Sequence, residues 1–260
     1  MPKEKNNIRV LLTRENNNAL SEALSARGGV DVLEIPLIKV EPSADANDMS
    51  DVLEEISRYD WITFSSPNGV KHFFNEFLKS LPDIRMLGLA RIACVGESTA
   101  SELKKFFLRA DVIPEESNSV SMIKKMDDYE RLENLKVLYV HGSISPKEII
   151  ARLEMDYHAI VDAVEVYKTT LLDVEKSSPA AVDFRKNGAD VVVFASPSAV
   201  ESFAKNAINL LLGTKAIRPK IVTIGATTTE ALAKYGMKVA AQAKSPSPED
   251  VADAVFEAVK

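Results

Sequence analysis

The chain contains one cysteine, three histidines and one tryptophan among 260 residues, and these scarcities exclude several classes of protein. Cys94 has no partner for an internal disulfide, and its position in an apolar strand pattern predicts a small buried residue. His72, His141 and His158 do not have the spacing of metal ligands. The sequence therefore predicts neither a disulfide framework nor a dedicated metal site.

Long apolar runs and an excess of positive charge are also missing. The first apolar run, Val10–Leu12, is too short for a signal-peptide core, and no run approaches the roughly 18–20 residues of a membrane-spanning helix. We therefore expect a cytoplasmic protein with no membrane partner. The net charge of −6 disfavours a nucleic-acid partner. An anionic ligand would have to be held by local amide and hydroxyl groups.

Two kinds of strand-to-helix unit each occur twice in the sequence. An apolar strand ending in Phe-x-Ser-Pro occurs at Phe64 and again at Phe194, 130 positions later. An apolar strand ending in glycine, followed by serine or threonine, occurs at Gly96 and again at Gly225, 129 positions later. The long period indicates two related domains rather than a repeat array. The helix after the second Ser-Pro turn is predicted to continue to Leu212.

The second glycine unit, IVTIGATTTEALA from Ile221 to Ala233, is the stretch with the clearest potential for ligand binding. Thr227 and Glu230 have capping-box spacing, which predicts a hydroxyl bonded to the amides of the first helical turn. The turn should lie at the carboxyl end of a parallel strand, where helix N-termini favour anions. Its threonines fit either an anion site or ordinary helix caps.

Two extended segments divide the chain into two α/β domains, one inserted into the other. Pro36–Pro42 and the β-branched Ala159–Lys168 read as strands that cross between domains and act as a hinge beside a cleft. The predicted fold is two doubly wound parallel sheets, each with helices on both faces. The predicted boundaries are 1–37 with 169–260 for the first domain, 43–163 for the inserted domain, and 38–42 with 164–168 for the two-stranded linker.

Seven short motifs, in this order, resemble those of the uroporphyrinogen-III synthase family. They are LLTR, FSSPNGV, VGESTA, EVYKT, FASPSAV, IGATT and SPSPEDVADAV, and together they extend over essentially the whole chain. Each motif is weak by itself, but their order and spacing are fairly specific. The family fold, two flavodoxin-like lobes joined by a two-stranded ladder, agrees with the domain layout predicted above.

The resemblance implies a cyclising lyase of haem and porphyrin biosynthesis. Such an enzyme closes the linear tetrapyrrole hydroxymethylbilane into uroporphyrinogen III, with inversion of ring D and loss of water, in the cleft between its domains. No cofactor and no metal are implied. The implied partners are this anionic tetrapyrrole and, transiently, hydroxymethylbilane synthase, and the implied oligomeric state is a monomer.

The resemblance also assigns candidate site residues. Tyr167 matches the family's tyrosine and is the candidate general acid for departure of the substrate hydroxyl, although it equally fits an ordinary amphipathic strand. Many relatives carry an arginine before the glycine at the end of the Lys136–Val140 strand, where this chain carries His141. His141 fits a ligand contact or an exposed side chain equally well. The substrate-binding candidates lie at strand ends and helix starts: Thr227, Thr228, Ser196, Ser65, Ser66, Ser98, Thr99, Thr13, Gly142 and Ser143.

The main alternative is a two-lobed small-molecule effector-binding protein without catalysis. The lack of a helix-turn-helix segment before Ile8 disfavours a repressor, and the lack of a signal sequence disfavours an exported binding protein. A dinucleotide enzyme fits less well, because no G-x-G-x-x-G follows a strand. Tyr167 in the linker favours the enzyme.

Overall fold

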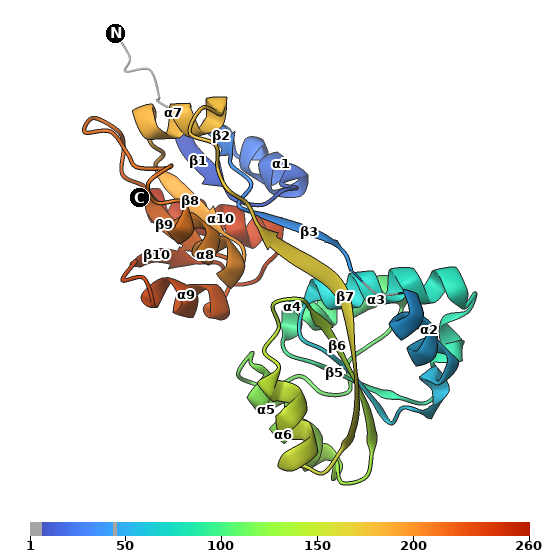
Figure 1. Cartoon of the computed structure of the whole chain (residues 1–260). Coiled ribbons are helices and arrows are strands. Elements are labelled where there is room, and N and C mark those ends of the chain that lie inside the picture. The colour runs from blue at the N-terminus through green and yellow to red at the C-terminus, as the bar shows by residue number, and fades with distance from the viewer. Residues whose placement is uncertain (1–6, 44–45) are drawn as a thin grey trace. The chain divides into compact units, whose positions relative to one another are not determined.

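The computed structural model describes residues 7–43 and 46–260, and it divides into two compact units (Figure 1). Unit 1 is formed by Met1–Lys39 with Thr170–Lys260, and unit 2 by Val40–Thr169. Residues 1–6 of the first predicted domain and 44–45 of the second lie outside the described residues.

Unit 1 is a five-stranded sheet with helices on both faces, in the order β10-β9-β8-β1-β2, and its strand pairs are parallel. Neighbouring residues of one strand point to opposite faces: Leu11 packs with α7, α8 and α9, whereas Val10 packs with α1 and α10. The elements are β1 (Ile8–Leu12), α1 (Asn18–Ala26), β2 (Val30–Glu34), α7 (Pro179–Asn187), β8 (Val191–Phe194), α8 (Pro197–Lys205), β9 (Lys220–Thr223), α9 (Ala226–Ala233), β10 (Val239–Gln242) and α10 (Pro248–Val259).

Unit 2 repeats this plan with a second five-stranded sheet, in the order β3-β7-β6-β4-β5. Its α-helices and strands are β3 (Ile38–Pro42), α2 (Ala46–Glu54), β4 (Trp61–Phe64), α3 (Pro67–Ser80), β5 (Arg91–Cys94), α4 (Glu97–Leu103), α5 (Ser119–Tyr129), β6 (Lys136–Gly142), α6 (Glu148–Met155) and β7 (Ile160–Leu171). Short 3₁₀ helices cover Ile56–Arg58, Ile84–Leu87 and Lys104–Phe106. The largest core cluster lies under α3, whose Phe73, Phe74 and Phe77 are fully buried.

Both sheets have a flavodoxin-like strand order, which confirms the predicted fold class. In unit 1 the first strand in sequence, β1, lies between the second, β2, and the third, β8. In unit 2, β4 lies in the same way between β5 and β6. In unit 1 the chain therefore runs from β1 to one side, to β2, and later continues on the other side, at β8, so the point between β1 and β8 is a switch point. In unit 2 the corresponding switch point lies between β4 and β6. The carboxyl ends of strands at such a switch point are where open α/β sheets bind ligands.

The chain passes from unit 1 to unit 2 within β3 and returns within β7. β3 is the edge strand beside β7. Hydrogen bonds from the Ser43 amide to the Val166 carbonyl and from the Leu172 amide to the Leu37 carbonyl run in the antiparallel sense.

The helix after the second Ser-Pro turn, α8, is shorter than predicted: it ends at Lys205 and not at Leu212. The buried Asn206 follows it. The Asn206 side chain accepts from the Val174 amide at 2.8 Å and donates to the Leu172 carbonyl at 2.8 Å. These bonds tie the chain to a neighbouring loop at this point.

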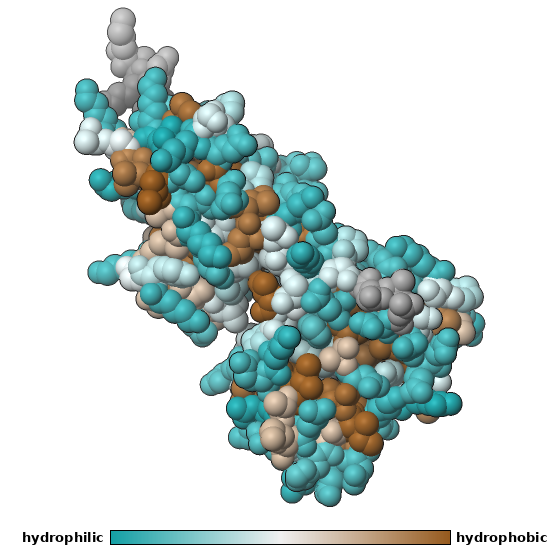
Figure 2. All heavy atoms as spheres, in the orientation of Figure 1, coloured by the Kyte–Doolittle hydropathy of each residue, from teal (hydrophilic) through white to brown (hydrophobic). Residues whose placement is uncertain are grey.

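Hydrophilic residues predominate on the visible faces of both units, with hydrophobic residues in scattered patches (Figure 2). Within residues 7–43 and 46–260, no helix combines the length and the apolarity that crossing a membrane requires.

Cys94 ends β5 and is fully buried, as the sequence predicts. Burial, with a smaller contribution from the Glu97 carboxylate, raises the pKa of its thiol to about 12. We therefore expect the native protein to resist a thiol reagent such as DTNB at pH 8, because the thiolate is the reactive form. Unfolding in guanidinium chloride should release one equivalent of thiol. Rapid labelling of native protein would contradict this burial.

Candidate functional site

The switch point of unit 2 brings together the ends of β4 and β6. Ser65 and Ser66 follow β4, and Gly142 ends β6 with Ser143 next in the chain. The register between β6 and β7 shifts here: His141 is opposite Glu165, but Gly142 is opposite Tyr167. A bulge of this kind redirects side chains and is common beside active sites. In this sheet it brings Tyr167 against Gly142.

Tyr167 occupies a slot that only glycine leaves open. A Cβ atom added to Gly142 would lie 2.6 and 2.7 Å from the Cε2 and Cε1 atoms of the Tyr167 ring, and closer still to Cζ. The Tyr167 and Ser66 hydroxyl oxygens are hydrogen bonded at 2.9 Å. Ser66 Oγ also accepts from the Gly69 amide at 3.0 Å, which caps α3. The position of the Tyr167 hydroxyl is thereby tied to the start of that helix.

The Tyr167 hydroxyl is suited to donate a proton or a hydrogen bond. Its side chain is buried, and burial raises the pKa of the hydroxyl while the hydrogen bond with Ser66 opposes that change. A tyrosine whose pKa is above the ordinary value of about 10 keeps its proton at neutral pH.

The two residues flanking Gly142 are held by the strands. The half-buried His141 ring stacks on Tyr139, with ring centroids 5.3 Å apart and an interplanar angle of 18°, and its Nδ1 lies 3.1 Å from the Gly142 carbonyl oxygen. Ser143 is exposed, and its hydroxyl accepts from the Thr169 amide at 3.0 Å. The backbone at this strand end is therefore fixed from both sides.

At the switch point of unit 1, a small cavity of about 90 Å³ lies beside the ends of β1 and β8 and is also lined by α1 and the start of α10. The buried Thr13 lines it, and its hydroxyl donates to the Val193 carbonyl at 2.8 Å, so Thr13 bridges the two strands. Asn17 also lines the cavity and donates from Nδ2 to the Arg14 carbonyl at 2.8 Å.

The helix starts of the two repeated motifs differ in how their amides are satisfied. The Ser-Pro starts cap themselves: Ser66 accepts from Gly69 in α3, and Ser196 accepts from Ala199 in α8 at 3.2 Å. The glycine starts have Gly96 and Gly225 as N-caps, with no side-chain cap hydrogen bond. Because the first turn of a helix has no internal partners for its amides, the glycine starts are the open ones.

The capping box predicted from Thr227 and Glu230 is therefore wrong. The helix begins earlier, at Ala226, so Thr227 lies within the first turn and not at the cap. The side chain of Thr227 is exposed and that of Thr228 is buried. The next residue, Thr229, is bonded to Thr223 Oγ1 and Gln242 Oε1, each at 2.7 Å.

The equivalent start in unit 2 is less favourable for an anion. The first turn of α4 contains the exposed Glu97, whose negative charge opposes the binding of an anion at this helix start. Ser98 is half-buried and Thr99 is fully buried. The first turn of α9, by contrast, contains no acidic residue.

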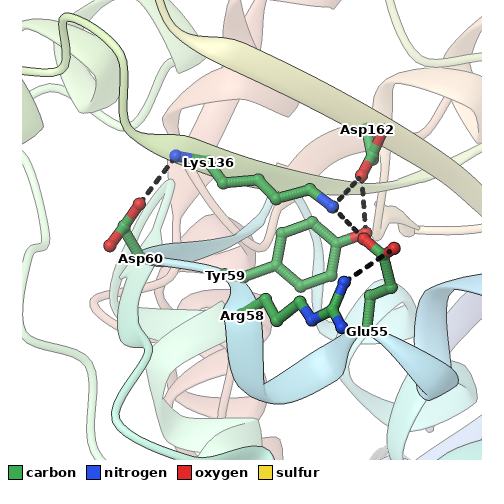
Figure 3. Close-up of polar contacts among 6 residues, drawn as sticks. All are labelled: Glu55, Arg58, Tyr59, Asp60, Lys136 and Asp162. Atoms are coloured by element: carbon green, nitrogen blue, oxygen red, sulfur yellow. Dashed lines mark hydrogen bonds and ion pairs between the residues drawn. The ribbon is translucent and has the colours of Figure 1, made fainter.

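At the opposite end of β6, six polar and charged residues form a network (Figure 3). Lys136 Nζ binds Glu55 and lies 3.2 Å from Asp162 Oδ2, while its backbone amide donates to Asp60 Oδ2 at 2.7 Å. The same Nζ lies 4.7 Å from the centroid of the Tyr59 ring, whose hydroxyl donates to Asp162 at 2.8 Å. Arg58 completes the set by pairing with Glu55 at 3.3 Å. Because these groups satisfy one another, the network fits a structural role.

Replacing Lys136 with Met should lower stability at pH 7, and the loss should shrink in acid. Hydrogen bonding to Lys136 lowers the pKa of Glu55, so the pair stabilises the fold above the ordinary carboxyl pKa and less as pH falls through the lowered value. Urea denaturation at pH 7 and at about pH 4 tests this. Arg58→Met is the control, expected to change little because the Arg58 pair is exposed. If the free energies of unfolding of wild type and Lys136→Met differ by the same amount at both pH values, the stabilising role of the Lys136–Glu55 pair is contradicted.

The geometry adds two features that the sequence patterns did not reveal. One is the approach of Gly142 to Tyr167, which depends on the register shift. The other is the stacking of His72 on Tyr167, with centroids 5.8 Å apart and an interplanar angle of 24°.

Among the residues that the structure describes, no group of three His, Cys, Asp or Glu side chains is placed to hold a metal ion.

Comparison with known proteins gives consistent matches over nearly the whole chain. A family model described as "Uroporphyrinogen-III synthase HemD" matches residues 18–253. The uroporphyrinogen-III synthase of Chlorobaculum parvum is 26% identical over 255 residues, which cover 96% of this chain and 99% of that protein. The porphyrin biosynthesis protein HemD of Ruminiclostridium josui is 30% identical over 240 residues, which cover 91% of this chain and 46% of that protein.

Solved structures agree on the fold. A mutant uroporphyrinogen III synthase from the extremely thermophilic bacterium Thermus thermophilus aligns with a TM-score of 0.68 at 18% identity, covering 97% of this chain and 98% of that one. The uroporphyrinogen-III synthetase of Helicobacter pylori aligns with a TM-score of 0.58 at 15% identity, covering 96% of this chain and 98% of that one. At these identities the structural likeness shows a shared fold.

Proposed function

The chain belongs to the uroporphyrinogen-III synthase HemD family, a family of cyclising lyases, and from this membership we propose its reaction. It closes the linear tetrapyrrole hydroxymethylbilane into uroporphyrinogen III, with inversion of ring D and loss of water. The observation that carries the proposal is the family match over residues 18–253, which includes Tyr167 and the end of every strand except β1.

Tyr167 is the residue that assists departure of the substrate hydroxyl. Donation from its protonated hydroxyl turns the leaving group into water and leaves an azafulvene-like cation. Attack by the substituted α-carbon of ring D forms a spiro intermediate, which fragments and recloses with that ring inverted. The proton that ring D loses on final closure restores the tyrosine.

Positioning of the substrate supplies most of the selectivity. Hydroxymethylbilane also closes unassisted, to the isomer with ring D uninverted, so the enzyme must hold one geometry and accelerate it. The substrate is rich in carboxylates, and the open start of α9 at Gly225, with Thr227 and Thr228, is the preferred anion site. A helix N-terminus contributes about 0.3–1 kcal/mol to an exposed anion.

The remaining substrate-binding candidates have different roles in this proposal. Ser65, Ser98 and Ser143 stay candidate contacts in unit 2, and the Ser143 hydroxyl, which accepts from the Thr169 amide, can still donate to a ligand. The Gly142 amide already donates to Ser145 Oγ at 3.2 Å, so the role of Gly142 is to leave room for Tyr167. Thr13 and Ser196 shape strand ends of unit 1, and Ser66 and Thr99 shape strand ends of unit 2. Thr13, Ser66 and Ser196 are already bonded within the protein, and Thr99 is buried.

The predicted domain boundaries, with 38–42 and 164–168 as a separate linker, stay a prediction. Unit 2, Val40–Thr169, contains all of 164–168 and most of 38–42. The location of the substrate between the domains stays a prediction, as do the monomeric state, the cytoplasmic location and the transient contact with hydroxymethylbilane synthase.

The reaction is tested by identifying the product isomer. Hydroxymethylbilane is generated in situ, the protein is added, and the oxidised porphyrins are separated chromatographically into type I and type III. Type III product in excess over a heat-denatured control is the expected result. A folded protein that yields only type I would contradict the proposal and favour an effector-binding protein without catalysis.

A further inference from the structure

The ring of Tyr167 is enclosed by residues from different elements. Gly142 of β6 lies against one part of the ring, Ser66 bonds the hydroxyl, and His72 stacks on the ring from α3. Tyr167 is only 7% exposed and His72 only 9%. The ring is therefore contacted by Gly142 and His72, and its hydroxyl is bonded to Ser66.

Two of these contacts come from one helix. Ser66 is the N-cap of α3 and His72 lies in its second turn, so both move with the helix. The following Phe73, Phe74 and Phe77 anchor α3 in the core with no exposed surface. A rigidly packed helix with two contacts to one tyrosine can fix both the position and the tilt of that ring.

The Ser66 contact alone cannot supply this control. One hydrogen bond at 2.9 Å fixes the distance of the hydroxyl oxygen but leaves the ring free to rock about it. Gly142 has no side chain, so it limits the ring on one side only. The stacked imidazole adds a contact to the ring itself, with centroids 5.8 Å apart, which a hydrogen bond at the hydroxyl does not supply.

The chemistry of His72 suits this task. Burial, aided by the positive charge of Lys71 and opposed by Glu76, lowers the pKa of His72, which favours the neutral imidazole. A neutral ring stacks on tyrosine without bringing a charge to the hydroxyl.

We infer that His72 is a positioning residue, which holds the Tyr167 ring against Gly142 so that the hydroxyl bonded to Ser66 keeps its direction toward the substrate. The inference rests on the proposed function, because it concerns how Tyr167 acts in that reaction. His72 acts through Tyr167 and needs no contact with the substrate.

The test compares His72→Ala, which opens the slot, with His72→Phe, which keeps an aromatic ring. Phe77→Leu is the matched control, because Phe77 is buried on the same helix and its ring contacts are with Phe73 and Phe74. All variants are examined as the full chain. Formation of type III product gives kcat and KM, and urea denaturation gives stability.

A second readout follows Tyr167 without reference to activity. The chain has six tyrosines, and ring ¹³C labelling with NMR detection gives a signal for each, with Tyr167 identified by its loss in Tyr167→Phe. In wild type, burial keeps the pKa of Tyr167 above the ordinary value. In His72→Ala water reaches the ring, so the alkaline midpoint of the Tyr167 signal should fall toward about 10.

The expected result is a kcat at least about ten-fold lower in His72→Ala, with a similar KM, and restored activity and titration in His72→Phe. Phe77→Leu should lower stability but leave the Tyr167 titration in place. A wild-type kcat in His72→Ala, or a Tyr167 titration that this substitution does not shift, would overturn the role of His72 and leave the proposed function standing. A wild-type protein that forms no type III product would instead overturn the proposed function, and the role of His72 with it.

Discussion

Gly142→Ala should lose about 100-fold or more in kcat while remaining folded. The added Cβ would lie within 2.7 Å of three atoms of the Tyr167 ring, so the ring must leave its slot. Displacement of a reacting group by about 1 Å costs on the order of 100-fold in rate. Overpacking of a buried site costs about 1–3 kcal/mol of stability. Steady-state kinetics and urea denaturation measure the two effects separately.

A double variant shows whether the collision is the cause. Tyr167→Leu removes the ring, so the stability that Gly142→Ala loses should be largely regained in the pair, although activity should not return. Gly213→Ala serves as the control, because a Cβ there meets only the Arg185 carbonyl oxygen, at 3.2 Å. If the stability losses of Gly142→Ala and Tyr167→Leu simply add in the double variant, or if Gly142→Ala keeps the wild-type kcat, the Tyr167 ring does not depend on the space left by Gly142.

Thr227→Glu should raise KM at least about ten-fold without destabilising the protein. The exposed Thr227 lies in the first turn of α9, where a carboxylate would occupy the positive end of the helix and repel an anionic substrate. The same charge stabilises the helix by about 0.3–1 kcal/mol, so affinity and stability should change in opposite senses. A ten-fold change in affinity corresponds to about 1.4 kcal/mol.

The neutral control for this change is Thr227→Gln, which has the same size as the glutamate and no charge. It should keep KM within a few-fold of wild type. Equal effects of Gln and Glu would attribute the change to side-chain bulk. An unchanged KM in Thr227→Glu would remove the start of α9 as an anion site.

Local patterns were enough to predict the sheets and their duplication. Short apolar runs such as Trp61–Phe64 and Val191–Phe194 are buried strands, and the Ser-Pro residues after each of them cap the next helix. Parallel sheets covered by helices followed from this alternation of strands and helices, and the flavodoxin-like form was implied by the family resemblance. These features depend on neighbours within a few residues, which a sequence displays directly.

The internal arrangement of the site was not predictable in the same way. Gly142 and Tyr167 are 25 positions apart, and they meet only because the register of β6 and β7 shifts by one residue at His141. His72 lies on a third element, α3. Apolar periodicity predicts which face of α3 is buried, but it does not reveal which strand residue His72 will meet there.

The start of α9 shows how a local rule can fail. Thr227 and Glu230 satisfy capping-box spacing, yet Gly225 takes the cap position with extended backbone. Glycine at a cap costs only a few tenths of a kcal/mol relative to serine or threonine, so the energetic signal is small. The resulting open amides are more useful for binding an anion than capped ones.

The most direct test of the account is catalytic turnover to one isomer. The protein is added at one hundredth of the concentration of hydroxymethylbilane generated in situ, and the fraction of type III product is followed until the substrate is consumed. The account predicts type III as the main product, since each molecule must act many times. Type I as the main product, with type III no greater than the amount of protein, would contradict a catalytic role.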